Sequence, residues 1–263
     1  MIDVQNQPGF NEIDIDKVGV CDVTYPIEVL DKRAEKQSTT AFINMYVDLP
    51  RQFKGTHMSR FIEVLNQYRG EITVRNMGQI LREIARSLEA NSAHMELGFK
   101  YFIEKTAPVS KSKSLMAYDC RFIAAYTEGN GEDFILEVKV PVMNLCPCSK
   151  EISGTAAHNQ RSEVTVQVRF QDFVWIEDVI ATVEGAASCD LYALLKRPDE
   201  KYVSERGYEN PRFVEDIVRI IASEFIQDPK VTWFSVTSKN FESIHNHNAY
   251  AFIERDKRDR EKA

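Results

Sequence analysis

The sequence predicts an α+β fold in which antiparallel strands and paired helices occur twice along the chain. Strand-like alternation and helical apolar spacing follow one another in the order strand, strand, helix, helix, strand, strand, and this order then recurs. Paired strands around grouped helices favour an antiparallel sheet over a doubly wound parallel one. With 263 residues, 43% of them apolar, the chain can bury one large core or two fused ones.

The first half of the chain supplies one set of expected elements. In the segment 39–49 apolar and polar residues alternate, as they do in a half-buried strand. Phe61, Val64 and Leu65 recur at helical spacing after the loop at 50–57. The expected elements are a short apolar segment at 25–30, a strand at 39–49, helices at 58–68 and 77–88, and strands at 94–105 and 116–127.

The second half repeats that order. Val164, Val166 and Val168 alternate along one of its strands. The expected elements are strands at 134–145 and 163–170, helices at 175–186 and 213–225, and strands at 233–241 and 249–254. We therefore expect an arm or partner-binding strand at 1–20, a first unit at 21–130, a second unit at 131–255 and a charged tail at 256–263.

Composition excludes several classes of protein. The chain has no apolar run of about 18 residues or more, so no membrane span is expected. Residues 1–20 lack the apolar region of a secretory signal, which makes a cytoplasmic protein the default. A formal net charge of -7 disfavours nucleic-acid binding, although a small anion needs only a few local cations. Five cysteines without regular spacing are not a disulfide framework.

The segment 145–162 is the richest in side chains that can perform chemistry. Cys146 and Cys148 lie two residues apart, and in an extended segment they would point to the same side. His158 follows, and thiolate with imidazole is a ligand set suited to Zn²⁺ or a similar ion. The alternative is two structural thiols and a surface histidine, and the residues alone leave the two interpretations at even odds.

Other polar clusters are more ambiguous. His245 and His247 are two residues apart and could move protons near neutral pH, but a polar strand end explains them as well. Glu215 stands in the first turn of an expected helix, where the dipole favours it, and Glu200 reads as a solvated loop charge. The loop at 54–60 suits an anion at a helix N-terminus, or contains an ordinary Ser or Thr cap.

Together these segments resemble the GTP cyclohydrolase IB family, in the same order along the chain. The resemblance implies the tunnelling fold, with tandem units that are each an antiparallel four-stranded sheet with two helices on one face. It also implies a homotetramer with active sites at the subunit interfaces. The matching stretches are KGTHMSRF at 54–61, LCPCSKEIS and AHNQRS within 145–162, KRPDEKYV at 196–203, YENPRFVED at 208–216 and SKNFESIHNHNAYA at 238–251.

The resemblance also implies roles for individual residues. The site would hold a divalent metal ion, Zn²⁺ or Mn²⁺ with Fe²⁺ as a third option. The family's metal ligands fall on Cys146, His158 and Glu200, its second cysteine on Cys148, its purine anchor on Glu215, and its acid/base histidines on His245 and His247.

The implied substrate is GTP. A metal would lower the pKa of water that adds to C8 of guanine, the ring would open, and C8 would leave as formate. Reclosure with the ribose would give 7,8-dihydroneopterin triphosphate, the first step of tetrahydrofolate biosynthesis. Candidates to hold the triphosphate are Lys54, His57, Ser59, Arg60, Arg75 and Lys239.

Two alternatives remain open at this point. A tunnelling-fold nitrile reductase would use a cysteine and NADPH, and the set Cys146, His158 and Glu200 would then be idle. A non-enzymatic metal-binding scaffold would need a closed site with four ligands. It would leave Glu215 and the histidine pair unexplained.

Overall fold

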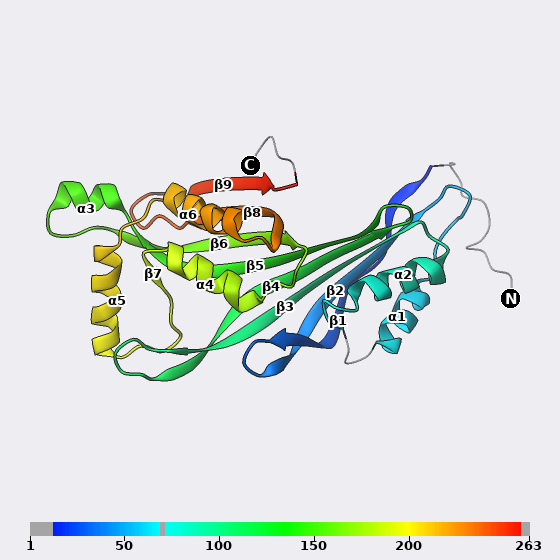
Figure 1. Ribbon diagram of the computed structural model, residues 1–263, viewed down its shortest axis with the longest axis horizontal. Coiled ribbons are helices and arrows are strands. Elements are labelled where there is room, and N and C mark those ends of the chain that lie inside the picture. Colours follow the sequence, from blue (N-terminus) through cyan, green and yellow to red (C-terminus); the bar gives the residue numbers. More distant parts are fainter. Residues whose placement is uncertain (1–12, 69–71, 259–263) are drawn as a thin grey trace. The chain divides into compact units, whose positions relative to one another are not determined.

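The computed structural model describes residues 13–68 and 72–258 as strands, helices and connecting loops (Figure 1). These residues divide into two compact units, and each consists of two stretches of sequence. Unit 1 comprises residues 1–100 and 121–136, and unit 2 comprises residues 101–120 and 137–263. Strands β3, β4 and β5 contribute one stretch to each unit.

The elements follow one another along the chain as the sequence order predicts, with additions. The strands are β1 (Ile15–Asp31), β2 (Glu35–Leu49), β3 (Ser92–Thr106), β4 (Lys113–Thr127), β5 (Gly131–Leu145), β6 (Asn159–Phe170), β7 (Cys189–Asp190), β8 (Val231–Asn240) and β9 (Ala249–Asp256). The helices are α1 (Met58–Gln67), α2 (Met77–Leu88), α3 (Pro147–Ser153), α4 (Ile176–Ala186), α5 (Arg197–Glu209) and α6 (Val214–Gln227).

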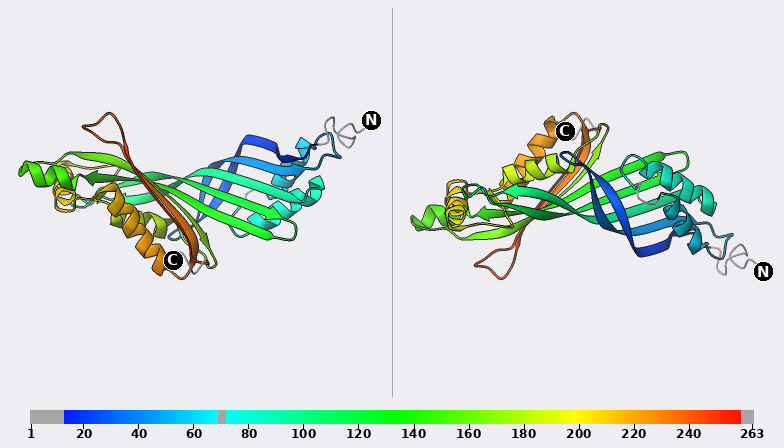
Figure 2. Two further views of the ribbon diagram at one scale, coloured as in Figure 1. Left: turned by 90° about the horizontal axis from the view of Figure 1, so that it is seen from above. Right: turned by 90° about the horizontal axis from the view of Figure 1, so that it is seen from below.

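In unit 1 the strands follow the order β1-β2-β3-β4-β5. Strand β2 is antiparallel to both β1 and β3, with Ile43 opposite Val23 and Leu97. Helices α1 and α2 lie beside each other along one face of these strands (Figure 2). Their buried residues, among them Phe61 and Ile80, pack against β1 and β2 and form part of the core of this unit.

In unit 2 the strands follow the order β3-β4-β5-β6-β8-β9, and β7 pairs with β5. Strand β8 is antiparallel to β6 and to β9. Helices α4 and α6 pack on each other and against this sheet, and bury Val183, Ile217 and Ile221. The candidate site lies in this unit, at the ends of β5, β6 and β8.

Three local expectations differ from the structure. Residues 15–20 belong to β1, because that strand pairs with β2 from Ile15 opposite Leu49 onward, and residues 1–12 of the expected arm lie outside the described residues. Residues 147–153 form α3, where we considered an extended segment around Cys146 and Cys148, and residues 197–209 form α5, where we expected a loop around Glu200. The compact units are discontinuous in sequence, whereas the expected units meet at a single cut after residue 130.

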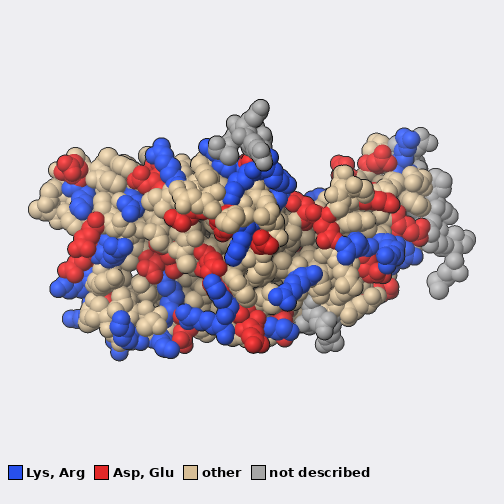
Figure 3. All heavy atoms as spheres, in the orientation of Figure 1, with Lys and Arg blue, Asp and Glu red and all other residues tan. Residues whose placement is uncertain are grey.

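Surface charges are mixed in sign. Figure 3 shows Lys and Arg side chains interspersed with Asp and Glu on the face that it draws. In the described part of the chain, no helix is long and apolar enough to cross a membrane.

Candidate active site

The site begins where β5 ends and α3 starts. Cys146 is the N-cap residue of α3, and its Sγ accepts a hydrogen bond from the backbone N of Ser149 at 3.5 Å. Pro147 occupies the first helical position, which suits a residue without a backbone donor. Cys148 therefore lies in the first turn of a helix and is exposed. The expectation that Cys146 and Cys148 share one side of an extended segment is wrong.

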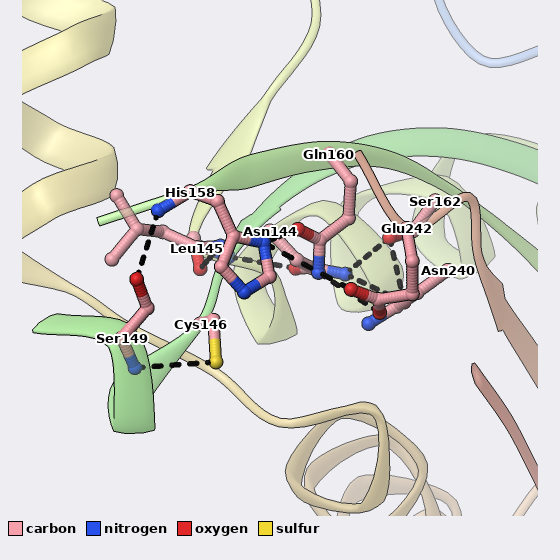
Figure 4. A network of polar contacts seen from close by, with 10 residues as sticks. Asn144, Leu145, Cys146, Ser149, His158, Gln160, Ser162, Asn240 and Glu242 are labelled. Carbon is pink, nitrogen blue, oxygen red and sulfur yellow. Dashed lines mark hydrogen bonds and ion pairs between the residues drawn. The ribbon is translucent and has the colours of Figure 1, made fainter. Parts of the chain in front are cut away.

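Two backbone hydrogen bonds bring His158 beside Cys146. The backbone N of Cys146 donates to the carbonyl oxygen of His158 at 3.1 Å. The backbone N of His158 donates to Oγ of Ser149 at 3.2 Å (Figure 4). The loop after α3 thus returns the chain to the strand end, and the thiol and imidazole predicted from the sequence lie at one place.

The imidazole of His158 contacts two polar side chains that lie deep in the site. Its Nδ1 is 3.1 Å from Oε1 of Gln160 and 3.9 Å from Oε2 of Glu242. The Nε2 of Gln160 donates to Oε1 of Glu242 at 3.3 Å (Figure 4). Gln160 comes from β6 and Glu242 from the connection after β8, so this contact joins two neighbouring strands.

The paired histidines lie in the connection between β8 and β9. The His245 ring stands edge-on to that of His158, with centroids 6.3 Å apart and an interplanar angle of 88°. His245 and His247 stack, with centroids 5.0 Å apart and planes 14° from parallel. Both are exposed. The structure therefore brings His158 together with His245 and His247, which follow it by more than eighty residues in the sequence.

A buried polar network lies next to Cys146, His158 and Gln160. The Nδ2 of Asn144 donates to Oγ of Ser162 at 2.7 Å, and that hydroxyl donates to Oδ1 of Asn240 at 2.7 Å. Oγ of Ser188 accepts from the backbone N of Leu145 at 3.1 Å. The network ties β5, β6 and β8 together next to His158 and Gln160 (Figure 4), and satisfied networks of this kind make a site rigid.

Glu200 lies on α5 and is exposed, so the expectation that it belongs to a loop is wrong. The preceding residue, Asp199, is fully buried and lies in the first turn of the helix. Its Oδ1 accepts from the backbone N atoms of Val109 and Ser110 at 2.8 Å each, and its Oδ2 accepts from that of Lys196 at 2.9 Å.

Burial raises the pKa of the Asp199 carboxyl, but hydrogen bonds from Ser110, Lys196 and Val109 outweigh burial and hold this pKa well below its usual range. The carboxylate thereby joins the start of α5 to the turn between β3 and β4. Within the described residues, no group of three His, Cys, Asp or Glu side chains lies close enough to hold a metal ion. The structure thus brings Cys146 to His158 and does not bring Glu200 to them.

The remaining residues expected to bind substrate are divided between the two units. In unit 2, Glu215 is exposed in the first turn of α6, and Lys239 is exposed on β8 with its Nζ 5.2 Å from the centre of the Phe241 ring. In unit 1, Lys54, Ser59 and Arg75 are exposed.

His57 and Arg60 line a pocket in unit 1, together with Asp48 and Glu89. Arg60 Nη1 donates to the carbonyl oxygen of Ser87 at 2.6 Å and lies 4.0 Å from Oε1 of Glu89. The N-cap of α1 is His57, and no side chain caps this helix in the described structure, so the alternative of an ordinary Ser or Thr cap is wrong.

Sequence reasoning missed Gln160, Glu242 and the buried polar network next to them. The spacing of Gln160 could have indicated its role, because it lies two residues from His158 and such residues share a face of an extended strand. Glu242 precedes the histidine pair by three residues. What the sequence lacks is the pairing of β6 with β8, which places Glu242 beside Gln160.

The fold and these side chains define a class: a tunnelling-fold protein with a thiol, three imidazoles and the carboxylate of Glu242 at one end of its sheet. Solved structures support the fold. A uricase from Arthrobacter globiformis is similar with a TM-score of 0.54 and 8% identity, covering 92% of this chain and 93% of that one. A uricase from Bacillus fastidious gives a TM-score of 0.56 at 8% identity, with 93% and 94% covered.

Sequence comparison identifies the family. The model of type I GTP cyclohydrolase folE2 matches residues 1–251. A GTP cyclohydrolase FolE2 from Syntrophus aciditrophicus is 59% identical over 97% of this chain and 100% of its own length. Another from Syntrophotalea carbinolica is 57% identical over 97% of this chain and 95% of its own. The chain belongs to the type I GTP cyclohydrolase family of the FolE2 kind.

Proposed function

We propose that the chain opens the imidazole ring of GTP by hydrolysis, releases C8 as formate and forms 7,8-dihydroneopterin triphosphate, at the start of tetrahydrofolate biosynthesis. The observation that carries the proposal is the meeting of Cys146, His158 and His245 at one strand end, in a chain of this family. Membership of the family also favours ring-opening hydrolysis over nitrile reduction and over a non-enzymatic scaffold.

The donor set fits a divalent metal ion. The Nδ1 of His158 is occupied by Gln160, which leaves Nε2 to bind a metal, and ligating histidines commonly have such a partner. Cys146 supplies a thiolate beside it, and Glu200 is the proposed third ligand. Thiolate and imidazole suit Zn²⁺, while a carboxylate also admits Mn²⁺ or Fe²⁺. A metal bound here would lower the pKa of a water molecule and make it a nucleophile near neutral pH.

The other residues act on protons and on the substrate. The proposed proton-transfer residues are His245, His247 and Cys148. The proposal is supported by the ring contact of His245 with His158, the stacking of His247 on His245, and the position of Cys148 two residues beyond Cys146. The carboxylate of Glu215 would accept two parallel hydrogen bonds from guanine N1–H and its 2-amino group.

The triphosphate needs cations and donors from the chain. The proposed set is Lys54, His57, Ser59, Arg60, Arg75 and Lys239, and it is drawn from both units. We further propose a homotetramer with interfacial active sites, in which a second copy would cover the exposed Glu215 and the histidine pair. The cytoplasmic location expected from the sequence stays a prediction.

The test is to incubate metal-loaded protein with GTP and follow formate and pterin fluorescence together. Both products should appear in equal amounts, chelation should abolish them, and Zn²⁺ or Mn²⁺ should restore them. Cys146→Ala should lose metal and turnover together, whereas Cys21→Ala, which removes an exposed thiol of β1, should keep both. Full turnover in protein shown by elemental analysis to be free of metal would contradict the proposal.

A further inference from the structure

We infer that Gln160 is a positioning residue that fixes the tautomer and orientation of the His158 imidazole, and that Glu242 fixes the direction of Gln160. His158 is a metal ligand under the function proposed above, and the consequence for metal binding rests on that proposal. The tautomer itself rests only on the three side chains and can be measured without metal.

The carboxylate of Glu242, at one end of this series of hydrogen bonds, determines the direction of each bond. A carboxylate has only acceptor oxygens, so the atom of Gln160 that faces Glu242 at 3.3 Å must be the amide NH₂. The carbonyl oxygen of the same amide then faces Nδ1 of His158 at 3.1 Å. Because that oxygen can only accept, Nδ1 carries the proton. In the neutral ring, Nε2 consequently holds a lone pair.

Burial makes these directions costly to reverse. Gln160 is 6% exposed, and the side chains of Glu242 and His158 are 10% and 12% exposed. Reversing the Gln160 amide would set its NH₂ against Nδ1–H and its oxygen against a carboxylate, and little water is available to compensate. The arrangement therefore holds one tautomer and one ring orientation.

The lone pair on Nε2 is what metal binding requires. Partners that hold the second nitrogen of a ligating histidine fix its tautomer and its ring direction, and their loss typically weakens metal affinity by about 10- to 100-fold. Gln160 needs no contact with substrate or metal for this effect, because it acts through His158.

A purely structural role for Gln160 is the competing explanation, and β6 supplies a matched control. Gln167 lies on the same strand and also bridges two side chains: its Nε2 donates to Oε2 of Glu137 at 2.5 Å, and its Oε1 accepts from Oγ of Ser235 at 3.3 Å. It has no histidine beside it in the described contacts. Gln160→Met and Gln167→Met therefore each remove a bridging glutamine from β6. Only Gln160→Met also removes the hydrogen-bond partner of His158.

The experiment has two readouts on each variant. In metal-free protein labelled with ¹⁵N-histidine, long-range ¹⁵N–¹H spectra report the tautomer of each of the five histidines, and His158→Gln assigns the signal. The Kd for Zn²⁺ is measured by competition with a chelating dye. We expect the Nδ1–H tautomer of His158 in the wild type and in Gln167→Met. Gln160→Met should show mixed tautomers and a Kd about 10- to 100-fold weaker.

Glu242→Gln is the second variant, for use if Gln160→Met does not fold. It keeps the shape of the side chain, but an amide at 242 can donate or accept, so Gln160 is free to reverse and mixed tautomers of His158 should appear.

An Nε2–H tautomer in the wild type, or an unchanged His158 tautomer in both Gln160→Met and Glu242→Gln, would overturn the inference. If instead His158→Gln binds Zn²⁺ as tightly as the wild type, the proposed ligand role of His158 fails. The tautomer spectra then still decide the inference about Gln160.

Discussion

Glu215 shows how one position can satisfy two explanations. It is in the first turn of α6 and is exposed, where a carboxylate favours the helix dipole whatever else it does. The resemblance to the family, and not any local contact, gives it the role of purine anchor. At Glu215, therefore, the helix-dipole explanation and the proposed role as purine anchor predict different effects of a substitution.

Replacing Glu215 by Gln separates the two roles. If the carboxylate serves only the dipole, the variant should lose roughly 0.3–1 kcal/mol of stability and keep its activity. If it anchors guanine in a site closed by a second copy, the amide sets an NH₂ against a substrate donor, at a cost of about 2–5 kcal/mol. We expect the second result, with kcat/KM for GTP reduced by roughly 30- to 5,000-fold, since each 1.4 kcal/mol is tenfold.

Bound metal should stay normal in this variant, because Glu215 is outside the proposed ligand set. The measurements are kcat/KM, metal content and Tm on the same preparation. A folded, metal-loaded Glu215→Gln enzyme with wild-type kcat/KM would remove the anchor role.

At the scale of elements, sequence patterns predicted best where one face of an element is apolar. Helices α1, α2, α4 and α6 bury such faces, and each was expected within two residues of its bounds. Helices α3 and α5 were not expected because neither has an apolar face of this kind. The first turn of α3 is held by the hydrogen bond from the backbone N of Ser149 to Cys146. The first turn of α5 is held by Asp199, which also accepts hydrogen bonds from the turn at 107–112, far away in the sequence.

The start of α5 can be tested against the start of α6. Asp199 and Asp216 each accept a hydrogen bond from the backbone N of the residue that precedes their helix, at 2.9 Å in both cases. Only Asp199 also holds two N–H groups of the β3–β4 turn. Asp199→Asn should therefore lower Tm at pH 7 more than Asp216→Asn, because it removes the buried charge that joins two elements.

The pH dependence has a definite sign. The pKa of Asp199 is lower in the folded chain than the value of about 3.9 expected when unfolded, so its contribution to stability is present above about pH 4 and is lost as pH falls through the folded pKa. The difference in Tm between wild type and Asp199→Asn should accordingly narrow in acid. Equal losses for the two variants at pH 7, or a difference that grows in acid, would contradict this role.

For the whole molecule, the α+β class and the antiparallel sheet followed from the order of the elements, while the way the chain divides did not. Strands β3, β4 and β5 are each about 15 residues long, and each passes through both compact units, which no local pattern marks. The candidate site shows the same limit. Motifs identified Cys146, His158 and the histidine pair, whereas Gln160 and Glu242 became visible only with the pairing of β6 and β8.

The proposed homotetramer with interfacial active sites can be tested by complementation between two inactive variants. Glu215 is exposed in the described chain, and under the proposed homotetramer a second copy would complete the site. If His158 of one subunit and Glu215 of another serve the same site, two inactive variants can complement each other. His158→Ala and Glu215→Ala, unfolded together and refolded at equal concentration, should regain roughly a quarter of wild-type sites, the share in which both contributions are intact.

The control is the same two variants mixed after folding, which should stay inactive while subunits do not exchange. Native mass spectrometry then shows whether the refolded sample contains mixed oligomers. Mixed oligomers without activity would mean that His158 and Glu215 of a single chain serve each site. Activity that scales with the fraction of mixed oligomers would place the site between copies and would account for the exposure of Glu215, the proposed guanine anchor, in a single chain.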